Sequence, residues 1–280
     1  MKRRVFYHNI GYDRNMKTIA VLPARYASTR FPGKPLAFIA GKPMIQWVWE
    51  AAKRSGVDSV VVATDDERIA AIVNDFDGRV VFTDPELPSG TDRVAAAVDR
   101  LDEKFDVVLN IQGDEPAMHH ETIASVVNLM TERLELPIGT AACPFYDMDE
   151  IFNPNNVKVV VDNQNRALYF SRSPIPYLRN STRFDMDFRP WAQSGQLALF
   201  RRHLGIYAYR PTALKQFISL PSHPLEQAEM LEQLRALAAG LAIGVAQTPH
   251  CSIGVDTPED IARVEKMLKK ILNQNCAFQS

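Results

Sequence analysis

The sequence predicts an α/β protein built on a mostly parallel sheet with helices on both faces. Strand-like and helix-like segments alternate through the first half of the chain. The strand-like segments are continuously apolar, which is typical of strands that are buried on both faces. Ligands of such sheets bind beyond the carboxyl ends of the strands. The polar residues that follow each strand are therefore the first candidates for a functional site.

The first half contains four short apolar runs. They predict strands over residues 18–22, 59–63, 80–82 and 107–111. Helical periodicity and end signals predict helices over residues 43–52, from 65 onward, 91–101 and 121–133. Pro43 suits the first turn of its helix, Gly56 suits the end of that helix, and Thr64 suits the cap of the next one.

The second half changes character. We expect strands over residues 157–161, 167–171, 205–209 and 241–247, and helices over residues 224–239 and 258–272. The polar residues 162–165 predict a hairpin turn between the first two of these strands. Residues 173–196 combine Pro, Arg and aromatic residues with little periodicity, which predicts a long loop.

No internal repeat or low-complexity linker divides the sequence. We therefore expect one domain over residues 17–280, with an inserted arm at about residues 145–202. Met16 directly precedes the first strand. Residues 1–16 are accordingly interpreted as an N-terminal extension outside the fold.

Composition excludes some classes of partner. The 280 residues carry a formal net charge of −1, which gives no global attraction to nucleic acid or to anionic membranes. No apolar run approaches the length of a membrane span, and no apolar segment of a signal peptide follows the basic residues 2–4. We expect neither nucleic-acid binding nor membrane insertion.

The three cysteines are scattered along the chain. Their spacing suggests neither a metal site nor a disulfide framework, and this usage is typical of a reducing cytoplasm. We expect Cys143 to fill the core and Cys276 to lie on the surface.

The segment after the first strand concentrates positive charge. Arg25, Arg30 and Lys34 lie in a loop of small residues and prolines over residues 22–36. Arginine offers forked donors to phosphate oxygens and lysine offers a compact charge, so this loop predicts a polyphosphate site. A solvated basic loop is the alternative.

Two aspartates are candidates for binding Mg²⁺. Asp114 follows the buried strand over residues 107–111, and Asp256 precedes the last helix, where Thr257 and Pro258 supply the cap and the first turn. Magnesium prefers carboxylate oxygens together with substrate phosphate and retained waters. A turn or a helix cap is the alternative role for Asp114.

Three other polar segments could contribute to a site. Residues 89–93 form either a turn with a helix cap or a small-residue loop that a base can approach, with Arg93 fixing the loop or the ligand. His203 and Tyr207 accompany the strand over residues 205–209, although a lone histidine is more often structural. Residues 229–235 belong to a helix whose polar side chains face either solvent or a pocket.

These segments, taken in order, resemble the 3-deoxy-manno-octulosonate cytidylyltransferases, also called CMP-Kdo synthetases. The resemblance covers nearly the whole chain from residue 17 to the last helix. It rests on residues 22–36, 41–45, 89–93, 112–116, 152–155, 167–172, 202–207, 229–235 and 254–260. The extension before Met16 and residues 180–196 depart from the pattern.

The resemblance implies a Rossmann-like nucleotide-diphospho-sugar transferase fold, a cytoplasmic homodimer with dimer contacts in the arm, and a Mg²⁺-dependent reaction between CTP and Kdo for lipopolysaccharide biosynthesis. It assigns the triphosphate and ribose to Arg25, Ser28, Arg30 and Lys34. It assigns the cytosine to Ala24, Ser89, Gly90 and Arg93. It assigns the sugar to Gln112, His203, Tyr207, Glu232 and Gln233. It assigns Mg²⁺ to Asp114 and Asp256, and catalysis to these two together with Arg25, Arg30 and Lys34.

Two alternatives to this function stay open from the sequence. The first is a cytidylyltransferase for another acidic sugar, such as 8-amino-Kdo or a sialic acid, because the chemistry around the nucleotide would be the same. The second is a non-catalytic nucleotide-binding relative. The presence of both Asp114 and Asp256 argues against the second, since nucleotide binding alone does not need paired metal ligands.

Overall fold

The structure, a computed structural model, describes residues 16–27, 30–178 and 196–277, with side chains in the last helix described up to Lys269. Residues 1–15 of the predicted extension, Ser28, most of the predicted loop over residues 173–196 and the side chain of Cys276 lie outside the described residues. Within the described residues, no helix is both long enough and apolar enough to cross a bilayer.

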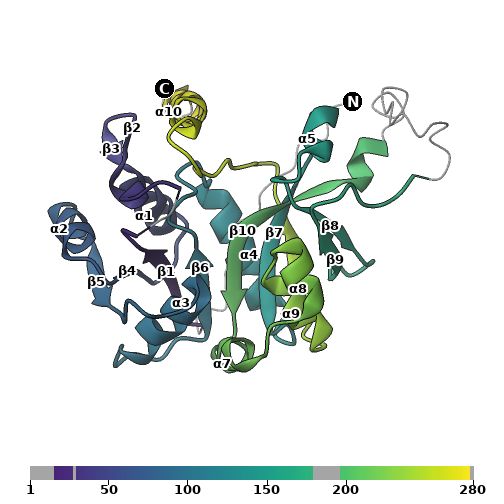
Figure 1. Cartoon of the computed structure of the whole chain (residues 1–280), viewed down its shortest axis with the longest axis horizontal. Coiled ribbons are helices and arrows are strands. Elements are labelled where there is room, and N and C mark those ends of the chain that lie inside the picture. The colour runs from purple at the N-terminus through teal and green to yellow at the C-terminus, as the bar shows by residue number, and fades with distance from the viewer. Residues whose placement is uncertain (1–15, 28–29, 179–195, 278–280) are drawn as a thin grey trace.

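Nine strands of the described residues form one sheet (Figure 1). Seven of them lie in the order β11-β7-β10-β6-β1-β4-β5, and the hairpin of β8 and β9 attaches beside β10. Their bounds are β1 Thr18–Ala24, β4 Ser59–Thr64, β5 Arg79–Phe82, β6 Val107–Ile111, β7 Ile138–Pro144, β8 Lys158–Val161, β9 Ala167–Ser171, β10 Arg201–Tyr209 and β11 Ile243–Gln247. A separate two-stranded sheet consists of β2 Phe38–Ile39 and β3 Lys42–Pro43.

The pairing confirms the predicted α/β sheet. Strands β4 and β6 flank β1 in parallel, and β5 and β11 add further parallel pairs at the two sides. Strand β10 runs antiparallel between β6 and β7. Its register shifts between Leu204 and Tyr207. The long central strand therefore carries an irregularity close to the end of β6.

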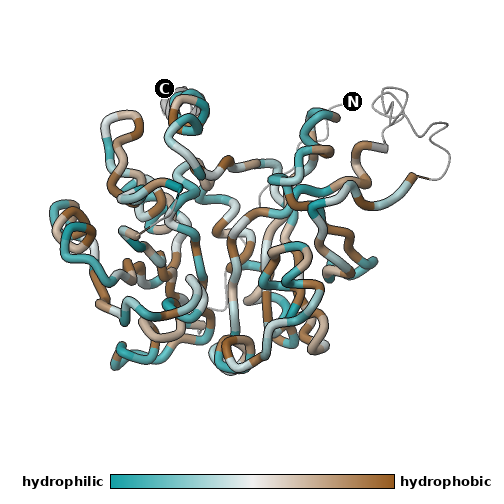
Figure 2. Tube along the Cα trace, in the orientation of Figure 1, coloured by the Kyte–Doolittle hydropathy of each residue, from teal (hydrophilic) through white to brown (hydrophobic). Residues whose placement is uncertain are grey.

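Helices cover both faces of the sheet. Their bounds are α1 Met44–Arg54, α2 Glu67–Asp75, α3 Gly90–Asp99, α4 His120–Glu132, α5 Met148–Phe152, α7 Pro211–Ser219, α8 Pro224–Glu229, α9 Gln233–Ala238 and α10 Asp260–Ala277, with the short 3-10 helices η1 Lys34–Leu36 and η2 Gln196–Leu199. Helices α1, α2 and α4 pack on one face, and α3, α7 and α9 on the other. Figure 2 shows brown and teal alternating along these helices, as expected where one side of a helix is buried.

The strands of the first half are buried from both sides. In β1, Ala20 and Leu22 belong to one hydrophobic cluster while Ile19 and Val21 belong to the other. Each of these side chains is fully buried. This arrangement explains why the run is continuously apolar, because a strand with a helix layer on each face has no solvent-facing side.

Several predicted helix ends are wrong by a turn or less. The cap of α2 is Asp66, whose carboxylate accepts the N–H of Arg68, and not Thr64, which ends β4. Helix α10 begins at Asp260, because the Asp260 carboxylate accepts the N–H groups of Asp256 and Thr257. The predicted end of the first helix is confirmed, since Gly56 follows the C-cap with a φ of 87°.

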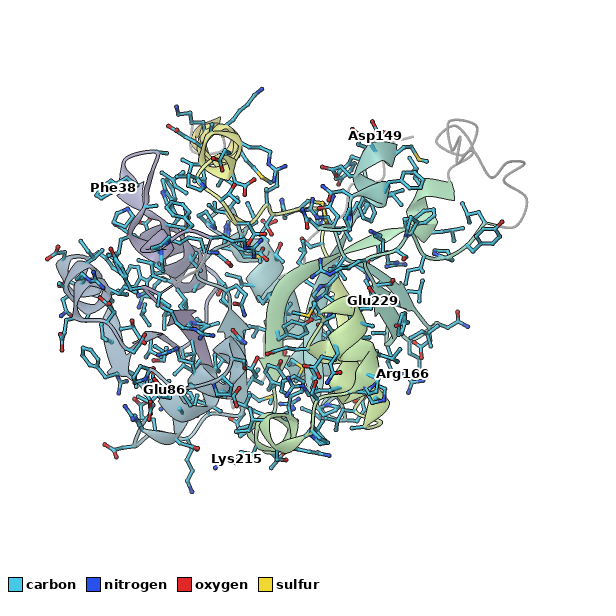
Figure 3. All side chains as sticks on the ribbon, viewed as in Figure 1. Phe38, Glu86, Asp149, Arg166, Lys215 and Glu229 are labelled. Carbon is cyan, nitrogen blue, oxygen red and sulfur yellow. A yellow bond between two sulfur atoms is a disulfide. The ribbon has the colours of Figure 1, made fainter. Side chains whose placement is uncertain are left out.

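The predicted single helix over residues 224–239 is wrong. The structure has two short helices, α8 and α9, because Met230 adopts a left-handed conformation with a φ of 53°. Glu229, labelled in Figure 3, accepts hydrogen bonds from the Ser171 hydroxyl and the Arg172 N–H at 2.6 and 2.8 Å. The break therefore lets the end of α8 bind the hairpin.

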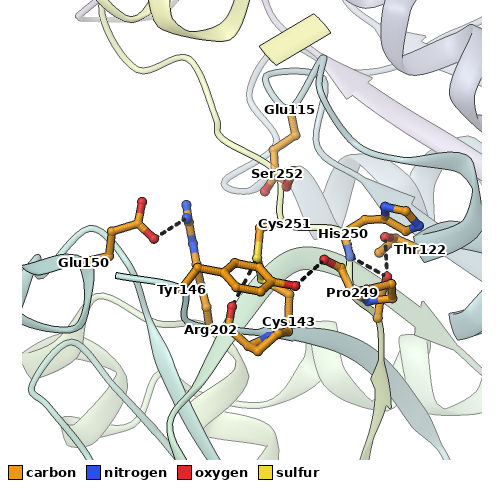
Figure 4. Close-up of a disulfide and its surroundings, with 12 residues drawn as sticks. Glu115, Thr122, Cys143, Tyr146, Glu150, Arg202, Pro249, His250, Cys251 and Ser252 are labelled. Carbon is orange, nitrogen blue, oxygen red and sulfur yellow. Dashed lines mark hydrogen bonds and ion pairs between the residues drawn. A yellow bond between two sulfur atoms is a disulfide. The ribbon is translucent and has the colours of Figure 1, made fainter. Parts of the chain in front are cut away.

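The expectation that the cysteines form no disulfide is also wrong. Cys143 at the end of β7 is bonded to Cys251 in the loop after β11 (Figure 4). The two residues are 108 positions apart in sequence. The expected burial of Cys143 is confirmed. The bond ties the loop that leads toward Asp256 to the sheet.

Candidate active site

The candidate site lies where β1 and β6 end. These strands are parallel neighbours in register from Thr18 with Val107 to Val21 with Asn110. Their carboxyl ends therefore deliver the loop after Ala24 and the loop after Ile111 to the same edge of the sheet. Helix α10 packs over α1 and β2 beside this edge (Figure 1).

A cavity of about 360 Å³ opens at this edge. Its walls come from the cationic loop, the start of α3 and the loop after β6. They are formed by Pro23, Ala24, Arg25, Ala27, Arg30, Lys34, Pro35, Gly90, Gln112, Gly113 and Asp114. The structure thus brings together seven residues predicted from sequence: Ala24, Arg25, Arg30, Lys34, Gly90, Gln112 and Asp114.

Lys34 is held rigidly at the cavity wall. Its ammonium donates to the Asp114 carboxylate at 2.6 Å and to the carbonyl of Val255 at 3.0 Å. Gly33, just before it, has a φ of 70°, and a Cβ there would lie 3.0 Å from the Tyr26 ring. Glycine therefore permits the turn that directs Lys34 toward Asp114.

The two aspartates lie on neighbouring segments. The N–H of Val255 donates to the carbonyl of Asp114 at 2.9 Å, which places the residue before Asp256 against Asp114. Asp256 in turn pairs with Arg30 at 3.1 Å. Asp114 lines the cavity and Asp256 does not, so the fold brings the backbones of the two segments together while each carboxylate is paired with a cation.

Two residues predicted to bind nucleotide have structural partners instead of lining the cavity. Ser89 caps α3: its hydroxyl accepts the N–H of Asp92 and donates to the Asp92 carboxylate at 2.6 Å. Arg93 is fully buried, pairs with Asp65 at 3.3 Å and donates to the hydroxyl of Thr83. The geometry supports the interpretation that Arg93 fixes the loop beside the cavity.

A chain of polar side chains leads from the cavity across the sheet. Gln112 donates to Asn110 at 3.1 Å, Asn110 donates to Thr91 at 3.3 Å, and Thr91 donates to Glu232 at 2.9 Å. The chain joins Gln112 and Glu232, two residues predicted to bind the sugar, through Thr91 at the start of α3.

Two polar groups near this series of hydrogen bonds lack hydrogen-bond partners within the described part of the molecule. They are the hydroxyl of Tyr207 and the side-chain nitrogen of Gln233, both buried. Tyr207 lies opposite Asn110 in the ladder of β10 and β6. Burial raises the pKa of Tyr207 well above its ordinary value, so its hydroxyl keeps its proton. Buried polar groups without partners are costly, and a polar ligand would satisfy them.

His203 lies within β10, not just before the strand as predicted. Its Nε2 is 3.0 Å from the hydroxyl of Thr140, and its ring stands edge-on to Phe170 at 5.0 Å. Burial lowers the pKa of His203 to about 3. The imidazole is therefore neutral at the pH of ordinary assays.

We expect the pKa of His203 to affect stability at acid pH. The unfolded chain takes up a proton near pH 6.5 while the folded protein does so near pH 3, so stability is lost as pH falls through this window. From pH 7 to pH 5 this group should remove about 2 kcal/mol of unfolding free energy. Urea unfolding at both pH values should show a loss about 2 kcal/mol larger in the wild type than in His203→Gln, because His119 and His120, whose pKa values are also lowered, contribute equally to both proteins. Equal pH dependence in the two proteins would contradict the assignment.

Glu115 is a residue that the sequence analysis quoted but did not assign. Its carboxylate accepts the N–H of Gly205 at 3.2 Å and the hydroxyl of Ser252. Burial raises its pKa. A Cβ at Gly205 would lie 2.3 Å from this carboxylate, so any larger residue there would have to displace the end of the Glu115 side chain. In the sequence, only its position next to Asp114 marked Glu115 as a candidate site residue. Its partners Gly205 and Ser252 come from distant segments, so the sequence did not show them.

Comparisons with known proteins agree with this geometry. A profile of the family described as cytidylyltransferase matches residues 19–243. The 3-deoxy-manno-octulosonate cytidylyltransferase of Thermodesulfovibrio yellowstonii is 48% identical over 260 residues, which cover 90% of this chain and 98% of that protein. The protein of the same name from Parabacteroides distasonis is 47% identical over 92% of this chain and 100% of its own length.

Two solved structures share the fold of this chain. A CMP:2-keto-3-deoxy-manno-octonic acid synthetase in complex with CTP aligns with a TM-score of 0.80 at 39% identity, over 91% of this chain and 99% of that one. A 4-diphosphocytidyl-2C-methyl-D-erythritol synthase from Anaerococcus prevotii aligns with a TM-score of 0.57 at 14% identity, over 90% and 99% of the two chains. The second match shows a shared fold.

Proposed function

This chain belongs to the cytidylyltransferase family of the 3-deoxy-manno-octulosonate cytidylyltransferases, and from that premise we propose its reaction. It transfers CMP from CTP to the anomeric hydroxyl of 3-deoxy-D-manno-octulosonate (Kdo), giving CMP-Kdo and pyrophosphate. CMP-Kdo then serves lipopolysaccharide biosynthesis. The observation that carries the proposal is the cavity in which Arg25, Arg30 and Lys34 face Asp114.

The cationic loop binds the triphosphate in this proposal. Arg25, Arg30 and Lys34 all line the cavity, and each can donate to phosphate oxygens. Ala24 and Gly90 also line it and leave space for the cytosine, while Ser89 and Arg93 hold the start of α3 in place. Ser28 remains a proposed ribose or phosphate contact.

Mg²⁺ is proposed to bind Asp114 and Asp256. In the structure these carboxylates pair with Lys34 and Arg30. The bound ion would neutralise phosphate charge and lower the pKa of the attacking hydroxyl. When the triphosphate enters, Lys34 and Arg30 exchange their carboxylate partners for phosphate oxygens and stabilise the departing pyrophosphate.

The sugar lies on the other side of the α-phosphate. We place it against Gln112, Tyr207, Glu232 and Gln233, where the hydroxyl of Tyr207 and the nitrogen of Gln233 have no other described partner. His203 supports this wall as a neutral imidazole. The protein then aligns the anomeric oxygen, the α-phosphorus and the leaving pyrophosphate, and this positioning supplies much of the rate.

An assay of pyrophosphate release tests the proposed function. With CTP and Mg²⁺, release should depend on added sugar and be greatest with Kdo, because the family members with this name share nearly the whole chain. The panel should include 8-amino-Kdo and a sialic acid. Preference for either of these sugars would replace Kdo as the proposed substrate. If none of the sugars gives pyrophosphate release, the chain is a nucleotide-binding relative without this activity. Omission of Mg²⁺ should abolish release.

We also propose a homodimer that uses the arm over residues 145–202. Four large apolar residues of the arm are exposed by more than half of their surface and would be buried if a partner covered the arm. They are Tyr146, Leu168, Tyr177 and Leu199. Sedimentation of the whole chain at micromolar concentration measures the oligomeric state.

A cytoplasmic location is proposed from the use of CTP, a nucleotide of the cell interior. The cysteine usage no longer supports this proposal, because Cys143 and Cys251 are bonded and disulfides are rare in the cytosol. Cell fractionation with detection of the chain measures the location directly.

A further inference from the structure

A cluster of histidine and carboxylate side chains lies outside the proposed site. His119 and Glu121 stand at the amino end of α4, and His250 lies in the loop after β11. Each residue offers one ligand atom, and the three atoms lie within 4.8 Å of one another. The rings of His119 and His250 stack with centroids 3.8 Å apart.

The separations suit one small ion. In a tetrahedral Zn²⁺ site with bonds near 2.1 Å, neighbouring ligand atoms are separated by about 3.4 Å. Here Nε2 of His250 is 2.7 Å from the Glu121 carboxylate, and Nδ1 of His119 is 4.0 Å from it. The observed separations lie on either side of the required value, and the two imidazole rings are stacked, so the side chains would have to rotate for the three atoms to surround one ion.

The backbone around the cluster is anchored from both sides. The N–H of His250 donates to the hydroxyl of Thr248, which is 3.1 Å from the hydroxyl of Thr122 on α4. Figure 4 shows His250 and Thr122 facing each other from the loop and the helix. On the other side, Cys251 is bonded to Cys143. The loop therefore holds His250 beside α4 before any ion binds.

Two of the three side chains are accessible to solvent. Glu121 and His250 expose 59% and 33% of their side chains, whereas His119 exposes 12%. The charge of Arg54 acts on His119 and opposes a cation here. The Glu121 carboxylate offsets that charge.

We propose that His119, Glu121 and His250 form a site for a divalent transition metal of the Zn²⁺ class. Two imidazoles and one carboxylate suit such metals, whereas Mg²⁺ prefers a set composed of oxygen atoms. The site leaves at least one coordination position for water. The Nδ1 of His119 gives up a long hydrogen bond of 3.3 Å from the N–H of Glu121. The ion joins α4 to the loop that continues toward Asp256.

Titration calorimetry with Zn²⁺ on metal-stripped whole chain tests this site. Excess Mg²⁺ occupies the Asp114 and Asp256 carboxylates, and reductant is left out so that Cys143 and Cys251 offer no thiolate. We expect one Zn²⁺ per chain, and a rise in unfolding temperature. His250→Ala and Glu121→Gln should each weaken binding about 10- to 100-fold.

A matched control is His223→Asn. His223 caps α8 and is not one of the three residues of the cluster, and asparagine keeps a capping acceptor. This variant should bind Zn²⁺ as the wild type does. The proposal is overturned if the wild type binds no stoichiometric Zn²⁺, or if both ligand variants retain its affinity. Pyrophosphate release is not used as the readout, so the result is independent of the proposed reaction.

Discussion

Replacing Asp114 by asparagine is expected to lower kcat/KM by about 30- to 900-fold, which corresponds to about 2–4 kcal/mol. Asparagine keeps the shape of the side chain and removes its charge. Asp114 lines the cavity and binds Lys34 at 2.6 Å, so the substitution removes a proposed Mg²⁺ ligand and also the anion that orients this lysine. Because both effects act on the reacting phosphate, we expect kcat to fall more than CTP affinity.

The measurement is steady-state pyrophosphate release over a series of Mg²⁺ concentrations. Loss of a metal ligand should move the Mg²⁺ dependence to higher concentration, whereas a purely structural role would leave its midpoint unchanged. Asp102→Asn changes an exposed loop aspartate in the same way and serves as the control. Wild-type turnover of Asp114→Asn at saturating Mg²⁺ would refute the assignment.

The position of Asp114 was predictable because parallel neighbouring strands deliver their following residues to one edge of the sheet. The same reasoning placed the cationic loop after β1 beside it, and the structure confirms that Lys34 and Asp114 meet. The position of the segment that carries Asp256 was not predictable from local sequence. The approach of residues 255 and 114 is set by a backbone hydrogen bond between segments far apart in sequence.

Other features carried too little local signal. Strand β7 was not predicted, and its residues include Gly139, Ala141 and Ala142, which have low strand propensity. The break between α8 and α9 depends on the left-handed conformation of one residue, Met230, and the hydrophobic periodicity of the sequence gives no sign of it. The disulfide joins residues 108 positions apart, so only the tertiary fold brings the two sulfur atoms together.

Arg93 shows how burial decides between two interpretations of one residue. The sequence placed it in a segment near the cytosine and left open whether it fixes the loop or the ligand. In the structure its side chain is fully buried and pairs with Asp65. A buried guanidinium needs partners, and Asp65 and Thr83, which follow the ends of two strands, both meet one of its nitrogens, whereas the other two nitrogens have no hydrogen-bond partner among the described residues. The loop beside the cavity is therefore held from inside the protein.

Replacing Lys34 by alanine is expected to reduce kcat/KM by about 30- to 900-fold. The main reason is that the positive charge that stabilises the departing pyrophosphate is removed. Stability should change by about 1 kcal/mol or less, because the Asp114 side chain that loses its partner is 35% exposed and can be hydrated. Calorimetry with CTP, pyrophosphate release and urea unfolding separate affinity, turnover and stability. We expect weaker CTP binding together with slower release.

A matched pair elsewhere in the molecule makes the comparison sharp. Lys42 binds Glu50 at the same 2.6 Å distance but lies outside the cavity, so Lys42→Ala should leave CTP binding unchanged. The double variant Lys34→Ala with Asp114→Asn should lose less than the product of the two single losses, since both side chains act on one triphosphate. Independent, multiplicative losses would mean that the 2.6 Å contact has no part in catalysis. Unchanged turnover in Lys34→Ala would dismiss the proposed role of the cationic loop.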